Sequence, residues 1–268
     1  MNPGLAGQTV CSFPHSLSVF FPAYNDAPSL PDLIENAFEV LEECVEDFEV
    51  IVVDDGSQDG SAELLQDLRE IYGPRLRVVT HCRNRGYGGA LRSGLAASSK
   101  EFVFYTDGDG QYDVHDLSRL LELVSPEVVL VNGYKTARQD PRHRIWIGAA
   151  YNWFARRLFR VRLRDIDCDF RLIRRKHIGG APLLSTGGAV CVELVKRLEN
   201  TGARIVEIPV GHYPRLHGRS QFFRVRSLAV TFFELFQLYW LTIARPWLRG
   251  KFFSTELRSH SSAGLHGD

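Results

Sequence analysis

The sequence predicts an α/β fold in which helices cover both faces of a mostly parallel β-sheet. Short runs of apolar, β-branched and aromatic residues alternate with segments of helical periodicity from residue 16 to residue 133. The runs expected to form strands are almost wholly apolar, as is usual for parallel strands that are buried on both faces. The chain has 268 residues, 44% of them hydrophobic and 24% charged, so it is long enough to bury a core of this kind.

The order of elements follows from these patterns. The expected strands are residues 16–21, 48–54, 76–80, 101–106 and 127–133. The expected helices are residues 30–46, 61–72, 88–98, 114–124 and 143–160. Pro22 is expected to end the first strand, and Ser29 followed by Pro31 is typical of a helix start. Beyond residue 160 the pattern is less regular, with one further strand expected over 207–213.

Composition narrows the class of protein. The formal net charge is zero, so no overall field draws the chain to nucleic acid, and we expect no nucleic-acid partner. The five cysteines are scattered and contain no C-x-x-C pair, which argues against a disulfide framework or a zinc site and fits a reducing, cytoplasmic compartment. The first sixteen residues lack a basic start and a long apolar run, so we expect no signal peptide.

Polar and acidic residues follow three of the expected strands. The clusters are Tyr24-Asn25-Asp26, Asp54-Asp55-Gly56-Ser57 and Asp107-Gly108-Asp109. In open α/β sheets, ligands bind beyond the carboxyl ends of the strands. The three clusters therefore predict a shared pocket that a cation would help to neutralise.

The stretch TDGDGQYD, residues 106–113, can be interpreted in several ways from its residues alone. It could form a turn, or one Asp could cap the next helix, which fits Asp113 best. A calcium loop is excluded, because its fifth, sixth and twelfth positions here are Gln111, Tyr112 and Ser118. Two carboxylates on one short loop remain suited to Mg²⁺ or Mn²⁺.

Six motifs occur in the order used by inverting family 2 glycosyltransferases. They are FPAYND (21–26), VVDDGSQDGS (52–61), RNRGYGGALRSG (83–94), TDGDGQYD (106–113), DCDFRLIRR (167–175) and YPRLHGRSQF (213–222). The chain most resembles the branch that transfers sugars to dolichyl or polyprenyl phosphate. The resemblance covers residues 16–223 and implies a GT-A nucleotide-sugar-binding fold, a nucleotide-sugar donor, a divalent metal and a lipid-phosphate acceptor.

The resemblance assigns donor-binding residues. The loop after the first strand would cradle the nucleoside, with the residues Pro22, Ala23, Tyr24, Asn25 and Asp26. Asp26 stands where the family usually has Glu. Asp54 and Asp55 match the pair that faces the base and ribose, whose hydrogen-bond donors suit carboxylate acceptors. Arg85 is expected to contact a phosphate, and the glycines that follow it allow close helix packing.

Asp107 and Asp109 match the D-x-D motif of the family, with Gly108 between them and Gln111 as a polar neighbour. The resemblance implies that Mg²⁺ or Mn²⁺, held by Asp107, Asp109 and Gln111, bridges the carboxylates to the donor diphosphate. The metal would neutralise the leaving group. Asp107, Asp109 and Arg215 are the expected catalytic residues.

An anionic phosphate acceptor needs cations rather than a general base. Arg138, Arg215 and Ser220 are the best matches to the family positions that bind the acceptor phosphate. Gln221 stands where related proteins often have Lys. The alternative is that such arginines are solvated or bind anionic lipid. The acidic stretch 165–170 either forms turns and caps or, through Asp169 with Arg171, orders the acceptor loop.

The leading hypothesis is a metal-dependent inverting hexosyltransferase that uses a donor of the GDP-mannose or UDP-glucose type and a polyprenyl or dolichyl phosphate. A family 2 transferase with another acceptor, such as a glycan, a lipid or a small natural product, is the alternative. A non-catalytic nucleotide-sugar-binding protein is a third hypothesis, disfavoured by the intact Asp107 and Asp109 pair. The donor base, the sugar and the oligomeric state stay open.

Residues 227–244 form a long apolar segment with Glu234 at its centre. Its polar residues fall on one side of a helix, so it is expected to be amphipathic and to lie in the interface of a membrane rather than to span it. The alternative is a helix packed on the catalytic domain or on a second copy.

The expected organisation is a flexible N-terminus (1–15), a GT-A catalytic domain (16–223), interface helices (224–251) and a disordered tail (252–268). The protein is expected to be peripheral, on the cytoplasmic face of a membrane.

Overall fold

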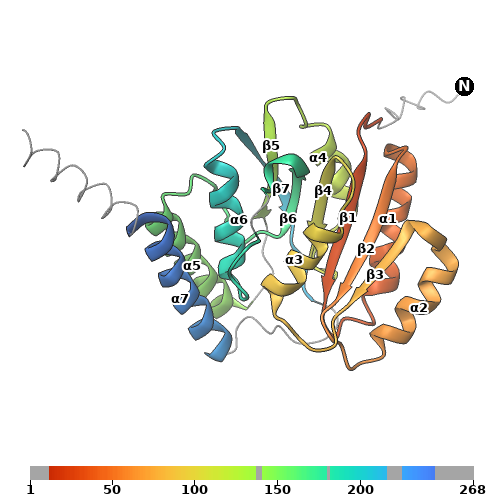
Figure 1. Cartoon of the computed structure of the whole chain (residues 1–268), viewed down its shortest axis with the longest axis horizontal. Coiled ribbons are helices and arrows are strands. Elements are labelled where there is room, and N and C mark those ends of the chain that lie inside the picture. The colour runs from red at the N-terminus through yellow and green to blue at the C-terminus, as the bar shows by residue number, and fades with distance from the viewer. Residues whose placement is uncertain (1–11, 137–140, 180–181, 216–224, 245–268) are drawn as a thin grey trace, which may run out of the picture.

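Seven strands form one sheet in the computed structural model, which describes residues 12–136, 141–179, 182–215 and 225–244. The strand order is β3-β2-β1-β4-β6-β5-β7 (Figure 1). The strands are β1 (Leu17–Ala23), β2 (Phe48–Asp54), β3 (Leu76–Thr80), β4 (Phe102–Thr106), β5 (Val128–Thr136), β6 (Phe170–Arg174) and β7 (Arg204–Gly211). Only β6 is antiparallel to its neighbours, β4 and β5, so the prediction of a mostly parallel sheet is confirmed.

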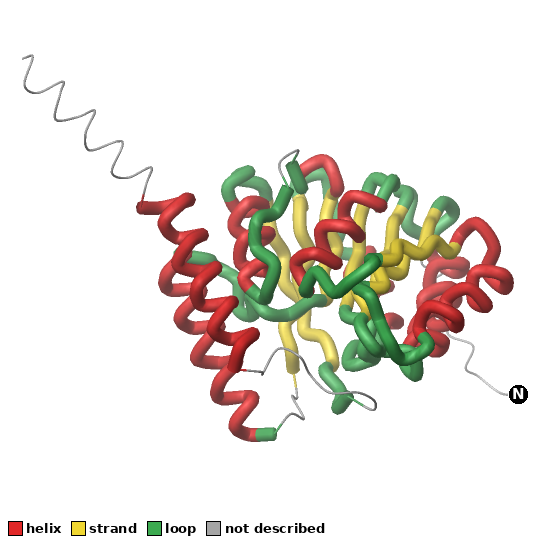
Figure 2. Tube along the Cα trace, turned by 60° about the horizontal axis from the view of Figure 1, so that its bottom comes forward, coloured by secondary structure: helices red, strands yellow, loops and turns green. Residues whose placement is uncertain are grey.

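Helices lie on both sides of this sheet (Figure 2). They are α1 (Leu30–Cys44), α2 (Ser61–Tyr72), α3 (Tyr87–Ala97), α4 (Leu117–Leu121), α5 (Arg142–Phe159), α6 (Ala189–Glu199) and α7 (Val225–Tyr239), which continues as a π-helical turn (Trp240–Ala244). The 3₁₀ helices are Gly73–Arg75, Val114–Asp116 and Arg175–His177. Helices α5, α6 and α7 gather at one end of the sheet, and α1 and α2 gather at the other (Figures 1 and 2).

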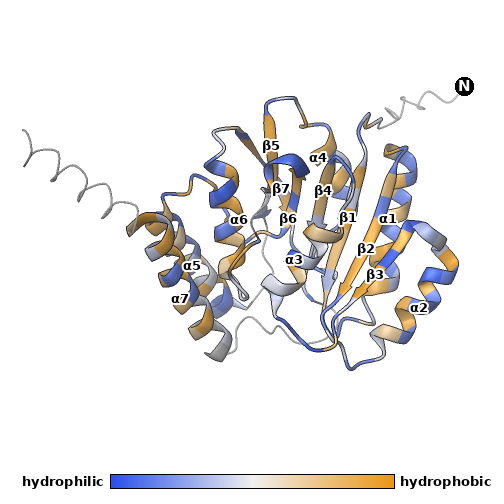
Figure 3. Ribbon diagram, in the orientation of Figure 1, coloured by the Kyte–Doolittle hydropathy of each residue, from blue (hydrophilic) through white to orange (hydrophobic). Residues whose placement is uncertain are grey.

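Each face of the sheet has its own hydrophobic core, because alternate strand residues point to opposite faces. Val19 and Phe21 of β1 belong to the core covered by α1, α2 and α4. Phe20 of β1 and Tyr105 of β4 belong to the core covered by α3, α5, α6 and α7. The strands are hydrophobic along most of their length (Figure 3). Burial on both faces explains why their sequences do not alternate.

Several element boundaries differ from the sequence-based predictions. Pro22 does not end the first strand, since β1 continues to Ala23. The Pro22 carbonyl accepts a hydrogen bond from the Gly108 N–H, and β4 pairs with β1 only as far as Phe20, so no ladder bond requires the missing Pro22 N–H. The helix expected over 114–124 is a 3₁₀ turn followed by the short α4. Asp113 caps that turn as predicted, by accepting the N–H of His115.

The sequence did not predict β6 or α6, and β6 contains a fully buried arginine. Arg171 donates from Nε to Asn132 on β5, from Nη1 to the Tyr105 hydroxyl on β4, and from Nη2 to the Ile166 carbonyl, at 2.8, 2.6 and 2.6 Å. The Asp169 carboxylate lies 3.3 Å from Nη1. These bonds hold β6 between β4 and β5. The role expected for Asp169 and Arg171 in the acceptor loop concerns residues 216–224, which lie outside the described ranges.

The inner side of α7 combines polar and apolar side chains. Thr231, Leu235 and Leu238 are buried and Glu234 is half-buried, where α7 contacts α5 and α6. Its outer side is exposed and strongly apolar. This side and the outer side of α5 together expose Trp146, Ile147, Trp153, Phe154, Val230, Phe232, Phe233, Phe236 and Trp240.

The exposed side chains of the two helices form one surface, which we call the α5/α7 aromatic surface. The rings of Phe154 on α5 and Phe232 on α7 have centroids 6.1 Å apart. Trp146 is 76% exposed and Phe233 is 68% exposed, unusual values for such large apolar groups. Within the described residues, no helix is both long enough and apolar enough to cross a membrane. The predicted tail (252–268) and most of the predicted N-terminal segment (1–15) lie outside the description.

Candidate functional site

The carboxyl ends of β1, β2, β3 and β4 bring the three polar clusters to one edge of the sheet. Backbone hydrogen bonds continue past the ends of the strands and align the loops that follow. The N–H of Asp55 donates to the Ala23 carbonyl at 2.9 Å, and the N–H of His81 donates to the Asp54 carbonyl at 2.9 Å. The prediction that these strand ends lie together therefore agrees with the structure.

Gly108 allows the loop after β4 to lie against the end of β1. Its N–H donates to the Pro22 carbonyl at 3.1 Å. A Cβ atom at position 108 would lie only 2.8 Å from that carbonyl oxygen, so any side chain would push the two loops apart. Glycine at the centre of the D-x-D motif thus places both aspartates beside the β1 loop.

Asp107 and Asp109 differ in their partners. The Oδ1 atom of Asp107 is shielded from solvent, and within the described part of the chain no donor makes a hydrogen bond of ordinary geometry to it. Burial, followed by the nearby Asp169 and Asp109 carboxylates, raises the pKa of Asp107 well above its usual range, although the Tyr87 hydroxyl acts in the opposite direction. Asp109 is also buried, but its Oδ1 accepts the Gln111 N–H at 3.1 Å. The site therefore concentrates negative charge around one unpartnered oxygen.

Arg215 is the cation that faces these carboxylates. Its Nη2 and Nε donate to Oδ2 of Asp109 at 2.5 and 3.1 Å, and Nη2 lies 3.8 Å from Oδ1 of Asp26. Burial raises the pKa of Asp26 to about 6, although the Tyr24 N–H and Arg215 act in the opposite direction. The structure thus brings Asp26, Asp109 and Arg215 together; Arg215 was expected to act with Asp109, whereas Asp26 was expected in the nucleoside cradle.

Gln111 joins the D-x-D loop to the segment that contains Arg215. Its carbonyl accepts the Tyr213 N–H at 2.8 Å, and its side-chain amide donates to the Tyr213 carbonyl at 3.0 Å. In this arrangement the Gln111 amide nitrogen points to Tyr213. Its proximity to the carboxylates agrees with the predicted cluster, while its hydrogen bonds give it a role in holding Arg215 in place.

Asp54 and Asp55, predicted as a pair, have different surroundings. Oδ1 of Asp54 accepts the Ser57 N–H at 2.9 Å, so this carboxylate shapes the turn after β2. Oδ1 of Asp55 accepts the Arg85 N–H at 2.8 Å and lies 2.5 Å from Nδ1 of His81. Asp55 is therefore fixed by two groups of the segment between β3 and α3, and the side chain of Arg85 is exposed beside it.

His81 was not identified from the sequence. It is buried, with Nδ1 against Asp55 and Nε2 at 2.8 Å from the Ser93 hydroxyl. A histidine at the end of a strand has many ordinary roles, and only the parallel pairing of β2 with β3 places this one against Asp55. The sequence signal that could have identified His81 was its position, directly after Thr80 at the end of the third expected strand.

The β1 loop is fixed by hydrogen bonds to the loop after β2. Asn25 has a left-handed backbone conformation, with φ of 56°. Its N–H donates to the Ser57 hydroxyl, and its side-chain oxygen accepts the Gln58 N–H at 2.8 Å. The N–H of Tyr24 donates to Asp26 at 3.1 Å. Much of the predicted nucleoside cradle is therefore fixed by hydrogen bonds within the chain.

The carboxylate oxygens of Asp107 and Asp109 suit a divalent cation that a bound ligand helps to hold. Within the described ranges, no three His, Cys, Asp or Glu side chains are arranged to hold a metal by themselves. Asp107 and Asp109 nevertheless supply hard oxygen ligands, and the unpartnered Oδ1 of Asp107 is an available ligand atom. A bound diphosphate could supply the remaining oxygens, so the residues present fit the predicted Mg²⁺ or Mn²⁺.

Two predicted acceptor residues, Arg138 and Ser220, lie outside the described residues.

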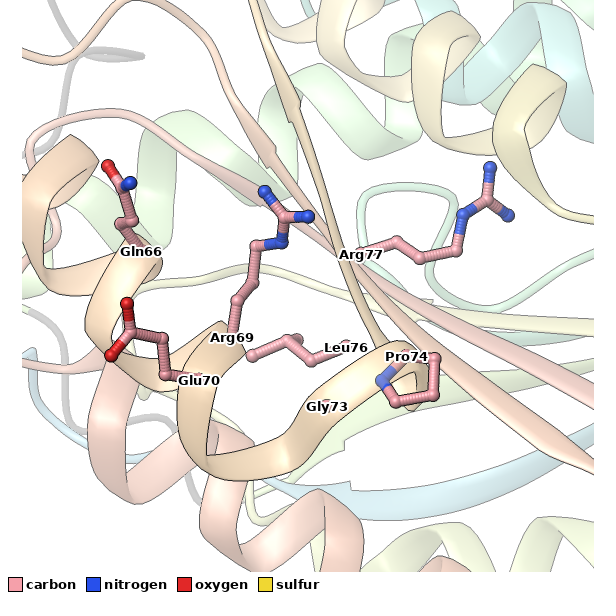
Figure 4. A pocket seen from close by; sticks show the side chains of 7 residues that line it. All are labelled: Gln66, Arg69, Glu70, Gly73, Pro74, Leu76 and Arg77. Carbon is pink, nitrogen blue, oxygen red and sulfur yellow. The ribbon is translucent and has the colours of Figure 1, made fainter.

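A separate hollow is lined by α2 and the start of β3, with the residues Gln66, Arg69, Glu70, Gly73, Pro74, Leu76 and Arg77 (Figure 4). Leu76 begins β3, whereas the carboxylate cluster follows the opposite ends of the strands. The hollow therefore does not belong to the candidate site.

Relatives with assigned activities are similar to most of the chain. An undecaprenyl-phosphate 4-deoxy-4-formamido-L-arabinose transferase of Pseudomonas aeruginosa is 33% identical over 217 residues, which are 81% of this chain and 63% of that protein. The enzyme of the same name from Aeromonas hydrophila is 31% identical over 207 residues, 77% of this chain and 62% of that protein. The matched region thus spans about three fifths of the length of these relatives.

Solved structures show the same fold. A glucosyl-3-phosphoglycerate synthase from Mycobacterium tuberculosis with bound UDP has a TM-score of 0.63 at 20% identity, covering 85% of this chain and 79% of that one. A mannosyltransferase from Pyrobaculum calidifontis with GDP-Man and Mn²⁺ has a TM-score of 0.58 at 21% identity, covering 95% and 76%. The expected GT-A fold is thereby confirmed. Residues 18–179 match the family described as Glycosyl transferase family 2, so the chain belongs to glycosyl transferase family 2.

Proposed function

We propose that the protein transfers a hexose from a nucleotide-diphosphate sugar to a polyprenyl phosphate, with inversion at the anomeric carbon. The main supporting observation is the buried carboxylate pair at the end of β4, in which Asp107 has an unpartnered oxygen and Asp109 binds Arg215. The names of the relatives from Pseudomonas and Aeromonas, which are undecaprenyl-phosphate sugar transferases, support the acceptor.

The donor would lie across the carboxyl edge of the sheet. Its nucleoside would contact the β1 loop and Asp55, and its diphosphate would face the D-x-D loop and Arg85. Asp55 suits recognition of base or ribose, because its Oδ1 is fixed by His81 and the Arg85 N–H while its second oxygen can accept from a ligand. Pro22, Ala23, Tyr24, Asn25 and Asp26 would form the wall of the nucleoside site.

Asp107 and Asp109 would hold Mg²⁺ or Mn²⁺ together with the donor diphosphate, with Gln111 beside them. A bound divalent cation supplies neutralisation of the leaving diphosphate. The chain itself orients the donor through the preformed loops of β1 and β2, which are tied together by Asn25, Ser57 and Gln58. Such preorganisation lowers the cost of reaching the reactive geometry.

Arg215 would hold the acceptor phosphate, with Arg138 and Ser220 as further contacts. A phosphate oxygen is already anionic, so the attack requires cations that align it rather than a group that removes a proton. Arg215 suits this role because its guanidinium lies at the same carboxylate pair that would hold the donor metal.

A transfer assay with labelled sugar tests this proposal and separates the acceptor classes. The protein is incubated with labelled UDP-glucose or GDP-mannose, Mn²⁺ and undecaprenyl phosphate, and the products are extracted into organic solvent. We expect the label in a lipid phosphate that mild acid releases. Label only in a water-soluble product would overturn the polyprenyl acceptor in favour of another acceptor.

We further propose that the α5/α7 aromatic surface rests on the cytoplasmic face of a membrane. A lipid surface suits it because large aromatic side chains favour the headgroup region. Exposed basic residues flank the apolar set on α5: Arg142 and His143 before it, and Arg157 and Arg160 after it. They provide charge complementarity to anionic headgroups.

Vesicle co-sedimentation tests the surface. Trp153→Ser combined with Phe233→Ser should weaken binding to vesicles that contain phosphatidylglycerol by about ten-fold or more. Ile71→Ser is the matched control, because Ile71 is 72% exposed on α2, outside this surface. Equal vesicle binding by all three proteins would exclude the membrane role. A concentration-dependent dimer that the double variant abolishes would assign the surface to a second copy instead.

A further inference from the structure

Glu234 is a charged residue in the middle of an apolar helix, and the structure shows what it binds. Its Oε1 accepts the Thr186 N–H at 2.7 Å and the Thr186 hydroxyl at 2.6 Å. Its Oε2 accepts the Gly187 N–H at 2.9 Å. One carboxylate on α7 therefore binds three donors of residues 185–187, the loop that precedes α6. Hydrogen bonds to a charged acceptor are about twice as strong as neutral ones.

The opposite side of the 185–187 loop lies directly on the start of α3. The Gly88 N–H donates to the Thr186 carbonyl at 2.8 Å. A Cβ atom at Gly86 would lie 2.7 Å from that carbonyl oxygen, and one at Gly88 would lie 2.2 Å from the Ser185 carbonyl oxygen. Arg92 adds a hydrogen bond from Nη1 to the Ser185 carbonyl at 2.8 Å. Two glycines thus allow backbone-to-backbone contact between the loop and α3.

Residues 85–88, which the loop supports, contact both acidic parts of the candidate donor site. The Arg85 N–H donates to Asp55 at 2.8 Å. The Tyr87 hydroxyl and Oδ1 of Asp107 are both shielded from solvent. The Tyr87 side chain acts on Asp107 as a hydrogen-bond donor that opposes the rise in the pKa of Asp107, so the two groups are neighbours. A shift of this segment would therefore move groups on both sides of the donor.

We propose that Glu234 is a positioning residue for donor binding. It binds Thr186 and Gly187 while Glu193 binds Ser185, so the two carboxylates together hold the 185–187 loop against Gly86 and Gly88, and the loop holds residues 85–88 against Asp55 and Asp107. The carboxylate thereby connects α7, which bears part of the exposed aromatic surface, to the nucleotide-sugar site at the edge of the sheet. The identity of the ligand rests on the proposed function. The alternative role, in which Glu234 only attaches α7, predicts no change in the site once the protein is folded.

Glu234→Gln is the informative variant, because it keeps the size of the side chain and removes the charge that Thr186 and Gly187 bind. Binding of UDP-glucose and of GDP-mannose is measured by calorimetry with Mn²⁺, and amide hydrogen exchange is measured without donor. We expect about ten-fold weaker binding of whichever donor binds the unmodified protein. We also expect faster exchange of the Gly88 amide. Gln237→Ala is the control, since Gln237 is exposed on the same helix.

The outcomes of these measurements distinguish failure of the positioning role of Glu234 from failure of the proposed function. A folded Glu234→Gln protein with unchanged donor affinity and unchanged Gly88 exchange would overturn the positioning role. If Glu234→Gln does not fold, Thr186→Val removes one of the three donors, and a smaller change in the same direction is expected. If the unmodified protein binds neither nucleotide sugar, the proposed function fails, while the exchange of Gly88 still tests whether Glu234 positions α3.

Discussion

The guanidinium of Arg215 binds one carboxylate oxygen of Asp109 through two nitrogens, at 2.5 and 3.1 Å. Asp109 is one of the two carboxylates expected to hold the metal, so the Arg215 side chain binds an oxygen atom that the metal would also use. Burial alone would lower the pKa of Arg215, but Asp109 outweighs it and raises that pKa. A divalent ion must therefore compete with Arg215 for Asp109.

Arg215→Gln should strengthen metal binding in the absence of donor. Removing the guanidinium frees Oδ2 of Asp109, and we expect the affinity for Mn²⁺ to rise by about ten-fold. The fraction of free Mn²⁺, measured by electron paramagnetic resonance during a titration, gives this affinity directly.

The control for this measurement is Arg75→Gln, which breaks an exposed ion pair with Glu42 far from the site. It should leave the affinity for Mn²⁺ unchanged. An affinity that stays the same or falls in Arg215→Gln would show that Arg215 and the metal do not compete.

Replacing Arg171 should destabilise the fold strongly. Arg171→Leu leaves Asn132, the Tyr105 hydroxyl and the Ile166 carbonyl without their buried donor, and it leaves Asp169 without its cation. Loss of one partner of a buried charged network costs about 3–5 kcal/mol. Urea denaturation should show a free energy of unfolding lower by that amount.

Arg175→Leu provides the comparison, because Arg175 is exposed and donates to the Lys100 carbonyl. Its expected cost is below about 1 kcal/mol. Equal costs for the two arginines would contradict the role assigned to the buried network.

The sequence predicted the elements whose residues have simple patterns. Residues 48–54, 61–72 and 76–80 form β2, α2 and β3 as expected, because buried parallel strands and amphipathic helices have distinct periodicities. The location of Asp26, Asp55 and Asp109 at one edge of the sheet also followed from the sequence, since parallel strand ends share one edge. The sequence did not predict strand β6. This strand contains two arginines, Arg171 and Arg174, and therefore lacks the apolar signal of its neighbours.

Contacts between distant segments were not predictable from one sequence. His81 gains its role only from the pairing of β3 with β2, and Glu234 gains its role only from the approach of α7 to residues 185–187. From sequence, Glu234 was an unfavourable charge in an apolar helix. In the structure Glu234 faces residues 186 and 187, while the large aromatic side chains of α7 face outward.

Asp167 should make stability depend on pH between about 4 and about 6. Burial raises its pKa from 3.8 to about 6, against the opposing effect of Lys135. In this window the folded state retains a proton that the unfolded state has released, so the free energy of unfolding falls as the pH rises. Asp167→Asn removes this contribution and should reduce the fall by about 1–2 kcal/mol, allowing for partial exposure of the group.

Chemical denaturation of both proteins at pH 4.5 and pH 6.5 measures the difference. Asp67→Asn, at an exposed position on α2, should leave the pH dependence of the unmodified protein intact. An Asp167→Asn variant with the same pH dependence as the unmodified protein would show that Asp167 is not the titrating group.

We propose that Asp107 and Asp109 bind the donor diphosphate through a divalent cation. Calorimetric titration of UDP-glucose and GDP-mannose in Mn²⁺ and in excess EDTA measures whether donor binding needs the cation. We expect one donor to bind in Mn²⁺ and to lose at least about ten-fold of its affinity both in EDTA and in Asp109→Asn. Equal donor affinity in Mn²⁺ and EDTA, unchanged by Asp109→Asn, would contradict the account.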